Sequence, residues 1–189
     1  MYKQDIPLIL ASKSPRRHEL LQAMDLTFQV VLKDVDESYP EELDPKDIAC
    51  YIAVKKAAAF TAERVANLVI TADTIVSCAG EIMGKPADET DALRMLTKLS
   101  GTTHQVYTGV CLSHGEKSST FSDLTEVTFR TLEPEEIRHY VTTCKPFDKA
   151  GAYGIQDWLG FVGVEKIAGS YSNVMGLPTE KLYQALSDF

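Results

Sequence analysis

Short apolar runs of strand length alternate with segments of helical spacing along almost the whole chain. Gly, Pro, Asp and Ser bound the apolar runs, whereas the segments between them repeat apolar residues every three or four positions. The expected strands are residues 8–11, the start of 28–38, 67–78, 82–83, 104–115, 118–132 and 161–169. The expected helices are residues 15–24, 44–66, 88–101, 133–144 and 178–189. This interleaving predicts an α/β fold, and the adjacent strands after Gly101 predict a mixed sheet.

Length, charge and cysteine spacing narrow the class of protein. The 189 residues suit one domain, and we expect residues 1–189 to form it. The net charge of -8 argues against nonspecific binding to nucleic acid or to a membrane, because both favour a basic surface. The N-terminal segment lacks the features of a signal peptide, and the four dispersed cysteines form no C-x-x-C pair. We therefore expect a cytoplasmic protein with reduced thiols.

The stretch LILASKSPRRHELL, residues 8–21, places two positive charges at the start of an expected helix. Ser14 is a natural N-cap and Pro15 a natural first residue, so Arg16 and Arg17 fall in the first turn. The helix dipole disfavours a cation there by about 0.3–1 kcal/mol. Two explanations remain open at this point. The arginines pair with nearby surface carboxylates, or they bind a phosphate or carboxylate together with the free N–H groups of the helix.

A carboxylate interrupts the apolar run LVITADTIV at Asp73, where an unpaired buried charge would cost several kcal/mol. Either the strand ends there and opens Asp73 to solvent, or its partner is a metal, a cation or a proton, and a structural salt bridge is one such case. Three lysines stand near expected strand, helix and loop ends. They are Lys56 in the long helix, Lys85 after the return strand and Lys149 at the start of the glycine-rich loop 148–156.

Basic and acidic side chains of this kind suit a polyphosphate that is bound with a divalent metal. Carboxylates, including those of the loop Asp34–Glu37, hold Mg²⁺ or Mn²⁺, and lysine and arginine hold phosphate oxygens. The sequence contains no Walker A motif, no G-x-G-x-x-G, no G-x-S-x-G elbow and no zinc-ligand spacing among its histidines. Water is therefore the expected nucleophile.

Four motifs, in this order, resemble the Maf family of nucleoside triphosphate pyrophosphatases. They are LILASKSPRRHELL, TADTIVSCAGEIMGKP, LSGTTHQVYTGV and DKAGAYGIQ, and the likeness extends to VMGLP near the C-terminus. The resemblance thus spans nearly the whole chain. It implies a mixed, twisted sheet flanked by helices, with two lobes around a cleft, related to the inosine triphosphate pyrophosphatases.

The resemblance also implies an activity, which is hydrolysis between the α- and β-phosphates of a nucleoside triphosphate to give the monophosphate and pyrophosphate. It implies a divalent metal, Mg²⁺ or Mn²⁺, a cytoplasmic location and a homodimer, with no nucleic-acid or membrane partner. Two alternatives stay open. One is a nucleotide-sensing regulator of septum formation that does not depend on hydrolysis, and the other is a purine-selective housecleaning pyrophosphatase.

The family's motifs carry roles onto numbered positions of this chain. Catalytic positions are matched by Asp73, Lys85, Glu37 and Lys56, and substrate-binding positions by Ser12, Ser14, Arg16 and Arg17. The resemblance implies that Asp73 is the proton acceptor and that Asp73 and Glu37 hold the metal. Whether Asp73 acts as general base or as metal ligand stays open.

Removal of Arg17 is a test that the charge argument suggests. If this arginine binds the substrate, Arg17→Ala weakens catalysis. Because the substitution also takes a cation away from the positive end of the helix, it is expected to leave the helix intact or slightly more stable.

In the family, three positions separate the branches by base choice, and they read Arg16, Thr74 and Gln156 here. Glutamine offers a donor and an acceptor, which suits the N3–H and O4 edge of uracil and thymine. The resemblance therefore implies dTTP and UTP, well above purine triphosphates and 7-methyl-GTP. The chain departs from the family pattern at two places, because Thr71 stands where many relatives have glycine and Asp157 and Trp158 stand where relatives often continue with glycine. The Asp157 carboxylate beside Gln156 would favour a donor-rich base such as cytosine.

Overall fold

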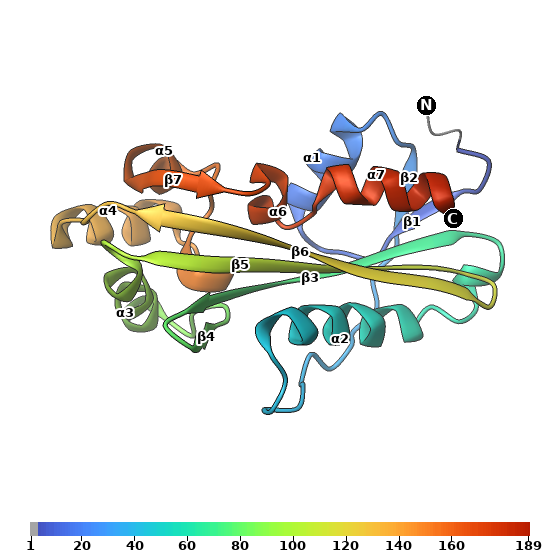
Figure 1. The fold of residues 1–189 in the computed structure, drawn as a ribbon, viewed down its shortest axis with the longest axis horizontal. Coiled ribbons are helices and arrows are strands. Elements are labelled where there is room, and N and C mark those ends of the chain that lie inside the picture. Colours follow the sequence, from blue (N-terminus) through green and yellow to red (C-terminus); the bar gives the residue numbers. More distant parts are fainter. Residues whose placement is uncertain (1–3) are drawn as a thin grey trace. The chain divides into compact units, whose positions relative to one another are not determined.

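The computed structural model describes residues 4–189, which form an α/β fold around one mixed sheet (Figure 1). Within these residues the strands are β1 (Leu8–Leu10), β2 (Phe28–Val30), β3 (Leu68–Cys78), β4 (Glu81–Met83), β5 (Thr103–His114), β6 (Lys117–Phe129) and β7 (Val164–Ala168). Their hydrogen-bonded order is β2-β1-β3-β5-β6-β7, and the short strand β4 pairs separately with β3. Strand β1 is parallel to β2 and β3, whereas β4 and β7 are antiparallel to their partners. The prediction of a mixed sheet is confirmed.

The helices alternate with these strands as the sequence predicts. They are α1 (Pro15–Ala23), α2 (Pro45–Ala58), α3 (Glu89–Leu99), α4 (Pro134–Cys144), α5 (Trp158–Gly163), α6 (Tyr171–Met175) and α7 (Thr179–Asp188), with short 3₁₀ turns η1 (Glu63–Val65) and η2 (Ala150–Ala152). Proline begins α1, α2 and α4, where its fixed φ suits the first helical turn and its missing N–H costs nothing. None of the helices in residues 4–189 is long and apolar enough to cross a membrane.

The contacts within the chain divide it into two compact units. Unit 1 comprises residues 1–74, 108–123 and 176–189, and unit 2 comprises residues 75–107 and 124–175. The prediction that residues 1–189 form a single domain stays a prediction.

In unit 1, the alternation of side chains along the strands decides which helix covers which face. Leu8, Ile70 and Val110 lie in one cluster with Leu21 of α1 and Leu182 of α7. Cys111, whose side chain points to the other face, packs with Ala53 and Ala57 of α2 instead. Figure 1 shows the same arrangement, with α2 on one side of the strands and α1 and α7 on the other. Successive strand residues therefore meet different helices.

The face of the sheet that packs against α2 requires a glycine at position 109. A Cβ at Gly109 of β5 would lie 2.4 Å from the backbone carbon of Ala49 in α2. The absence of a side chain lets the α2 backbone approach the sheet closely.

Unit 2 has its own core of large apolar side chains. Met95, Leu96 and Leu99 of α3 pack with Tyr140 and Val141 of α4 around the outer part of the sheet. Helix α3 begins at the Asp88 carboxylate, which accepts a hydrogen bond from the Asp91 N–H, and Gly101 follows its end with φ 68°. Gly101 thus supplies the left-handed residue that ends the helix, and the helix expected over 88–101 is confirmed.

Two of the expected elements have the wrong bounds, and the structure adds local details that the sequence did not predict. The helix expected over 44–66 ends at Ala58, because the chain turns there to bury Phe60 against Ile9 and Val69. The strand expected over 161–169 begins only at Val164, since residues 158–163 form α5. The short helix α6 was not expected, and the Ser14 and Asp44 side chains make no cap hydrogen bond, although both residues stand at the N-cap position.

Candidate active site

Strand β3 carries the adjacent polar residues Asp73 and Thr74 on opposite faces. Asp73 shares the α2 face with Thr71, whose hydroxyl donates a 2.7 Å hydrogen bond to the carbonyl of Ala53. Thr74 shares the other face with Ala72 and Ile70, which pack toward α1. The strand does not end at Asp73, because it continues to Cys78. One of the open explanations for this carboxylate is thereby removed.

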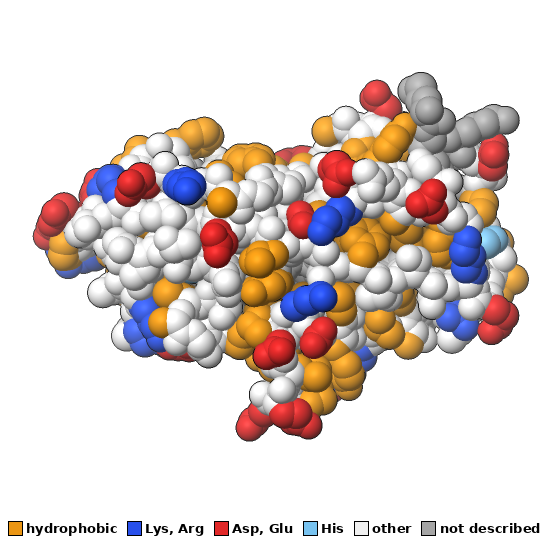
Figure 2. Space-filling view, viewed as in Figure 1, with side chains coloured by type: hydrophobic (Ala, Val, Ile, Leu, Met, Phe, Trp, Pro, Cys, Tyr) orange, Lys and Arg blue, Asp and Glu red, His pale blue; other side chains and the backbone are white. Residues whose placement is uncertain are grey.

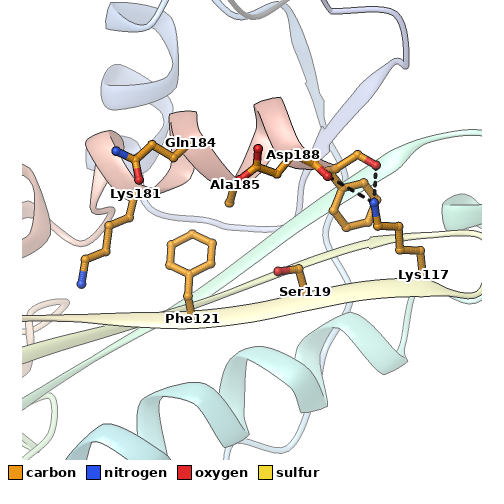
Figure 3. A pocket seen from close by; sticks show the side chains of 8 residues that line it. Lys117, Ser119, Phe121, Lys181, Gln184, Ala185 and Asp188 are labelled. Carbon is orange, nitrogen blue, oxygen red and sulfur yellow. Dashed lines mark hydrogen bonds between the residues drawn. The ribbon is translucent and has the colours of Figure 1, made fainter.

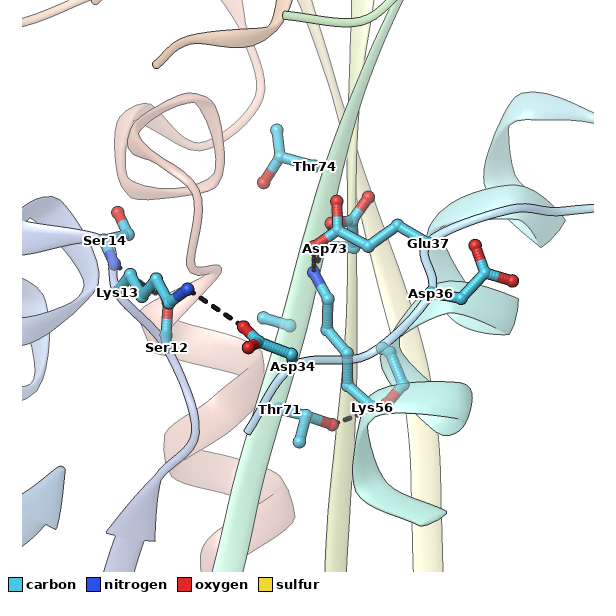
Figure 4. A network of polar contacts seen from close by, with 12 residues as sticks. Ser12, Lys13, Ser14, Asp34, Asp36, Glu37, Lys56, Thr71, Asp73 and Thr74 are labelled. Carbon is cyan, nitrogen blue, oxygen red and sulfur yellow. Dashed lines mark hydrogen bonds and ion pairs between the residues drawn. The ribbon is translucent and has the colours of Figure 1, made fainter. Parts of the chain in front are cut away.

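The partner of Asp73 is a cation, the ammonium of Lys56 on α2 (Figure 4). Lys56 Nζ lies 2.8 Å from Asp73 Oδ1 and 2.9 Å from Glu37 Oε1. The side chains of Asp73 and Lys56 are only 14% and 15% exposed, whereas that of Glu37 is 47% exposed. One ammonium therefore neutralises a nearly buried carboxylate and links it to a second carboxylate at the surface.

The acidic loop that carries Glu37 forms ion pairs with two adjacent lysines of α2, Lys55 and Lys56. Lys55 Nζ lies 2.8 Å from Asp36 Oδ2, and it also donates to the carbonyl of Ser38. Hydrogen bonds from Lys55 and Ser38 hold the pKa of the Asp36 carboxyl well below its usual range. Lys55 and Lys56 thus hold consecutive acidic residues of the loop, and this positions Glu37 beside Lys56.

Arg17 of α1 faces the other side of β3 and binds neutral acceptors. Its Nε donates to the Gly176 carbonyl at 2.7 Å, and its Nη1 donates to the Ala72 carbonyl at 2.8 Å. The hydroxyls of Ser12 and Thr74 accept two further hydrogen bonds, at 3.3 and 3.1 Å. Burial lowers the pKa of Arg17, and the nearby Asp73 carboxylate raises it. The guanidinium therefore hydrogen-bonds to β3 at the two residues that flank Asp73, namely Ala72 and Thr74.

The loop before α1 is organised around Ser12, whose side chain is buried. Ser12 Oγ accepts a 3.2 Å hydrogen bond from the Ser14 N–H, and the Ser12 carbonyl lies 2.8 Å from Nε2 of His18. The Ser14 side chain stands at the N-cap position but accepts no hydrogen bond from the first N–H groups of the helix. Arg16 lies half-buried in the same turn. The anion site that the sequence predicts at this helix start stays a prediction.

Unit 2 holds the remaining predicted residues, Lys85 and Gln156. Lys85 is exposed in the bend after β4, and the carbonyl of its neighbour Gly84 accepts a 3.1 Å hydrogen bond from the Gly151 N–H. Gly151 belongs to the loop that also carries Lys149 and Gln156. Two sequence motifs that are far apart in the chain, MGKP and DKAGAYGIQ, are thus joined by their backbones.

The carboxylates of Asp73 and Glu37 are donors of the kind that Mg²⁺ and Mn²⁺ prefer, and both reach the same ammonium group. Across residues 4–189, no group of three or more His, Cys, Asp or Glu side chains is arranged to hold a metal by itself. Mg²⁺ usually takes one or two carboxylates and completes its shell with water and substrate phosphates. The donor set fits a metal that binds together with its substrate.

Unit 1 also has an open groove of about 400 Å³ between α7 and β6 (Figure 3). Its lysines already have partners, since Lys117 donates to the Phe189 carbonyl and Lys181 lies 2.6 Å from Asp123. On the face shown in Figure 2, Lys and Arg side chains lie singly or in small groups beside acidic ones. The groove therefore does not resemble a triphosphate site.

Comparison with protein families supplies the identification. Residues 7–189 match the family described as Maf-like protein. The chain belongs to the Maf family.

Curated Maf relatives cover nearly the whole of this chain. The dTTP/UTP pyrophosphatase of Phocaeicola vulgatus is 53% identical over 181 residues, which are 95% of this chain and 94% of the relative. The dTTP/UTP pyrophosphatase of Bacteroides fragilis is 51% identical with the same coverage. A HAM1 protein from Coxiella burnetii, 13% identical, superimposes with a TM-score of 0.50 over 97% of this chain and all of that one, which shows a shared fold.

Some residues around these side chains were not singled out from the sequence. The carbonyls of Ala72 and Gly176 accept from Arg17, but backbone acceptors leave no mark in a side-chain pattern. Tyr140 is fully buried on α4 and hydrogen-bonds to Asp157. A signal for Tyr140 existed, because a tyrosine on the apolar face of a helix needs a partner for its hydroxyl.

Proposed function

We propose that this Maf protein hydrolyses dTTP and UTP between the α- and β-phosphates and releases the nucleoside monophosphate and pyrophosphate. The observation that carries the proposal is the match to curated dTTP/UTP pyrophosphatases at about 50% identity over about 95% of both chains. The enzyme class, a hydrolase of nucleoside triphosphates, follows from the same relatives. A cytoplasmic location and a homodimer remain predictions from the sequence.

In this proposal, Asp73 takes the proton of the attacking water, and Lys56 orients the Asp73 carboxylate and balances its charge. The 2.8 Å ion pair on a nearly buried strand supports this role, because an ionised base must be compensated there. Ser12, Ser14 and Arg16 at the start of α1 bind phosphate oxygens, and Lys85 assists the leaving pyrophosphate. Such positioning and neutralisation of charge account for most of the catalysis of phosphoryl transfer.

Asp73 and Glu37 would also hold a divalent metal, Mg²⁺ or Mn²⁺, with the substrate phosphates. When bound, the metal neutralises phosphate charge and lowers the pKa of a coordinated water. The exposed side of the Asp73–Lys56–Glu37 group is Glu37, so the surface carboxylate is the one that an arriving metal–nucleotide complex would meet first.

The test is a panel of nucleoside triphosphates with Mg²⁺ or Mn²⁺, scored for monophosphate and pyrophosphate. We expect kcat/KM for dTTP and UTP to be well above the values for ATP, GTP and 7-methyl-GTP, and Gln156→Glu to lose most activity on dTTP. Release of orthophosphate and a diphosphate would contradict the assigned bond. Tight binding of dTTP without turnover would support the sensor alternative, and preferred turnover of a purine triphosphate would support the housecleaning alternative.

A further inference from the structure

Asp157 follows Gln156 directly in the sequence, and its carboxylate contacts other residues of unit 2. It occupies the N-cap position of α5 but makes no side-chain cap hydrogen bond. Instead, Asp157 Oδ2 accepts a 2.7 Å hydrogen bond from the hydroxyl of Tyr140, and Lys149 Nζ lies 3.7 Å away. Asp157 therefore forgoes a favourable cap in exchange for contacts with two other parts of unit 2.

The Tyr140 hydroxyl hydrogen-bonds to both ends of the segment 154–157. This hydroxyl accepts a 3.0 Å hydrogen bond from the Gly154 N–H while it donates to Asp157 Oδ2. The Asp157 N–H donates in turn to the Gly154 carbonyl at 3.0 Å, which makes residues 154–157 a hydrogen-bonded turn. One buried hydroxyl thus holds both ends of the turn, and Gln156 lies inside it.

Close packing leaves this turn little freedom. A Cβ on Gly154 would lie 2.5 Å from Asp157 Oδ2, and a Cβ on Gly160 would lie 1.9 Å from the Ile155 carbonyl oxygen. Ile155 is buried in the core of unit 2. The backbone on both sides of Gln156 is therefore fixed by groups that a larger residue at Gly154 or Gly160 would displace.

Gln156 itself is half-buried, and its Oε1 atom has no hydrogen-bond partner among residues 4–189 although it is buried. A buried acceptor without a partner is unfavourable, and a donor on a ligand would remove this cost. The turn therefore holds in place an acceptor of the kind that the N3–H of thymine or uracil needs.

We propose that Asp157 and Tyr140 are positioning residues that fix Gln156 for base selection, and that the Asp157 carboxylate does not itself read the base. The inference rests on the proposed function and extends it. Because Oδ2 accepts from the Tyr140 hydroxyl and lies 3.7 Å from Lys149 Nζ, this carboxylate oxygen is directed at groups of unit 2 and not at a donor-rich base. The preference for cytosine that its sequence position suggests is accordingly not expected.

The kinetic test compares kcat/KM for dTTP and dCTP in Asp157→Ala, in Asp157→Asn and in the matched control Glu165→Ala, which removes an exposed carboxylate of β7. Asp157→Ala should lower the dTTP/dCTP ratio at least tenfold through a higher KM for dTTP, with kcat within threefold. Asparagine keeps an acceptor for Tyr140, so Asp157→Asn and Glu165→Ala should stay within twofold of the wild-type ratio. In a Gln156→Ala background, Asp157→Ala should change the ratio no further.

An unchanged ratio in Asp157→Ala, or the same loss with and without Gln156, would overturn the proposal. A selective loss of dCTP turnover in Asp157→Ala would also overturn it, because the carboxylate would then read the base.

Amide hydrogen exchange without nucleotide provides a readout that does not depend on activity. Asp157→Ala and Tyr140→Phe should speed exchange in residues 154–157, and Glu165→Ala should not. Unchanged exchange rates in residues 154–157 would refute the proposal that Asp157 and Tyr140 position Gln156. A wild-type protein that fails to hydrolyse dTTP would instead refute the proposed function.

Discussion

Arg17→Ala should destabilise the protein, although a charge argument from the sequence gives the opposite sign. The sequence argument treats Arg17 as a cation at the positive end of α1, where its removal gains about 0.3–1 kcal/mol. In the structure, the guanidinium instead donates four hydrogen bonds to two carbonyls and two hydroxyls. The contacts reach Gly176, which is 159 positions away in sequence. Arg17 therefore joins the C-terminal part of unit 1 to β3 and α1.

The size of the effect follows from the acceptors that lose their partner. The hydroxyls of Ser12 and Thr74 keep other hydrogen bonds, to the Ser14 N–H and to Thr108 Oγ1. The carbonyls of Ala72 and Gly176 lose a charged donor, at about 1–3 kcal/mol each. Water that enters the space left by the side chain recovers part of this cost. We expect the free energy of unfolding to fall by about 2–4 kcal/mol.

Urea unfolding of the wild type, Arg17→Ala and Arg17→Lys measures this quantity directly. Lysine keeps the charge but cannot span four acceptors with one nitrogen, so Arg17→Lys should recover less than half of the loss. Arg16→Ala removes the same charge from the same helical turn and should change the free energy of unfolding by less than about 1 kcal/mol. An Arg17→Ala protein as stable as the wild type, or more stable, would refute the reasoning.

Three further predictions concern buried ionisable groups. Asp73→Asn should lower kcat by about 10²–10⁴-fold and leave the protein folded, as circular dichroism would show; near-normal turnover would make Asp73 a structural residue. Lys56→Ala should lower the free energy of unfolding by roughly 3 kcal/mol, because it leaves the Asp73 and Glu37 carboxylates without their cation, and Lys56→Arg should restore part of it in urea titrations; equal losses in the two variants would contradict this. Burial lowers the pKa of His104 to about 4, below the value of about 6.5 expected for the unfolded chain. The unfolded state then binds the extra proton, so this contribution, roughly 3 kcal/mol, is present above pH 6.5 and is lost as the pH falls toward 4. His104→Phe should flatten the fall of Tm between pH 6.5 and 4, and a slope equal to that of the wild type would count against it.

Most strands, the longer helices and the need of Asp73 for a partner were predictable because each depends on local pattern. Apolar runs bounded by turn residues gave six of the strands nearly to the residue, and a carboxylate inside such a run indicated a partner. The start of 161–169 was wrong because Leu159 and Gly163 are buried on one side of the short helix α5, while Phe161, which favoured the strand, is 76% exposed.

The identity of partners was not predictable, because it depends on which residues face each other across unit 1. Lys55 and Lys56 are adjacent in the sequence and equally able to form ion pairs, yet Lys55 holds Asp36 and only Lys56 reaches Asp73. The choice depends on the rotation of α2 over the sheet. The residues next to Lys55 and Lys56 in the sequence do not determine that rotation.

The register of β1 against β3 explains why the predicted catalytic and binding residues of unit 1 lie together. Leu10 lies opposite Ile70, and the Ala11 N–H donates to the Ile70 carbonyl, so Ser12 begins its loop at the level of Ala72. Parallel strands bring their carboxyl ends to one edge, which is where α/β sheets build their sites. Beyond that edge, the pleat of β3 turns Asp73 to Lys56 on one face and Thr74 to Arg17 on the other. A slip of one residue in β3 would exchange these two partners and place the carboxylate against a guanidinium whose donors are already directed at neutral acceptors. The arrangement therefore depends on the strand pairing, which the buried apolar residues of β1 and β3 fix.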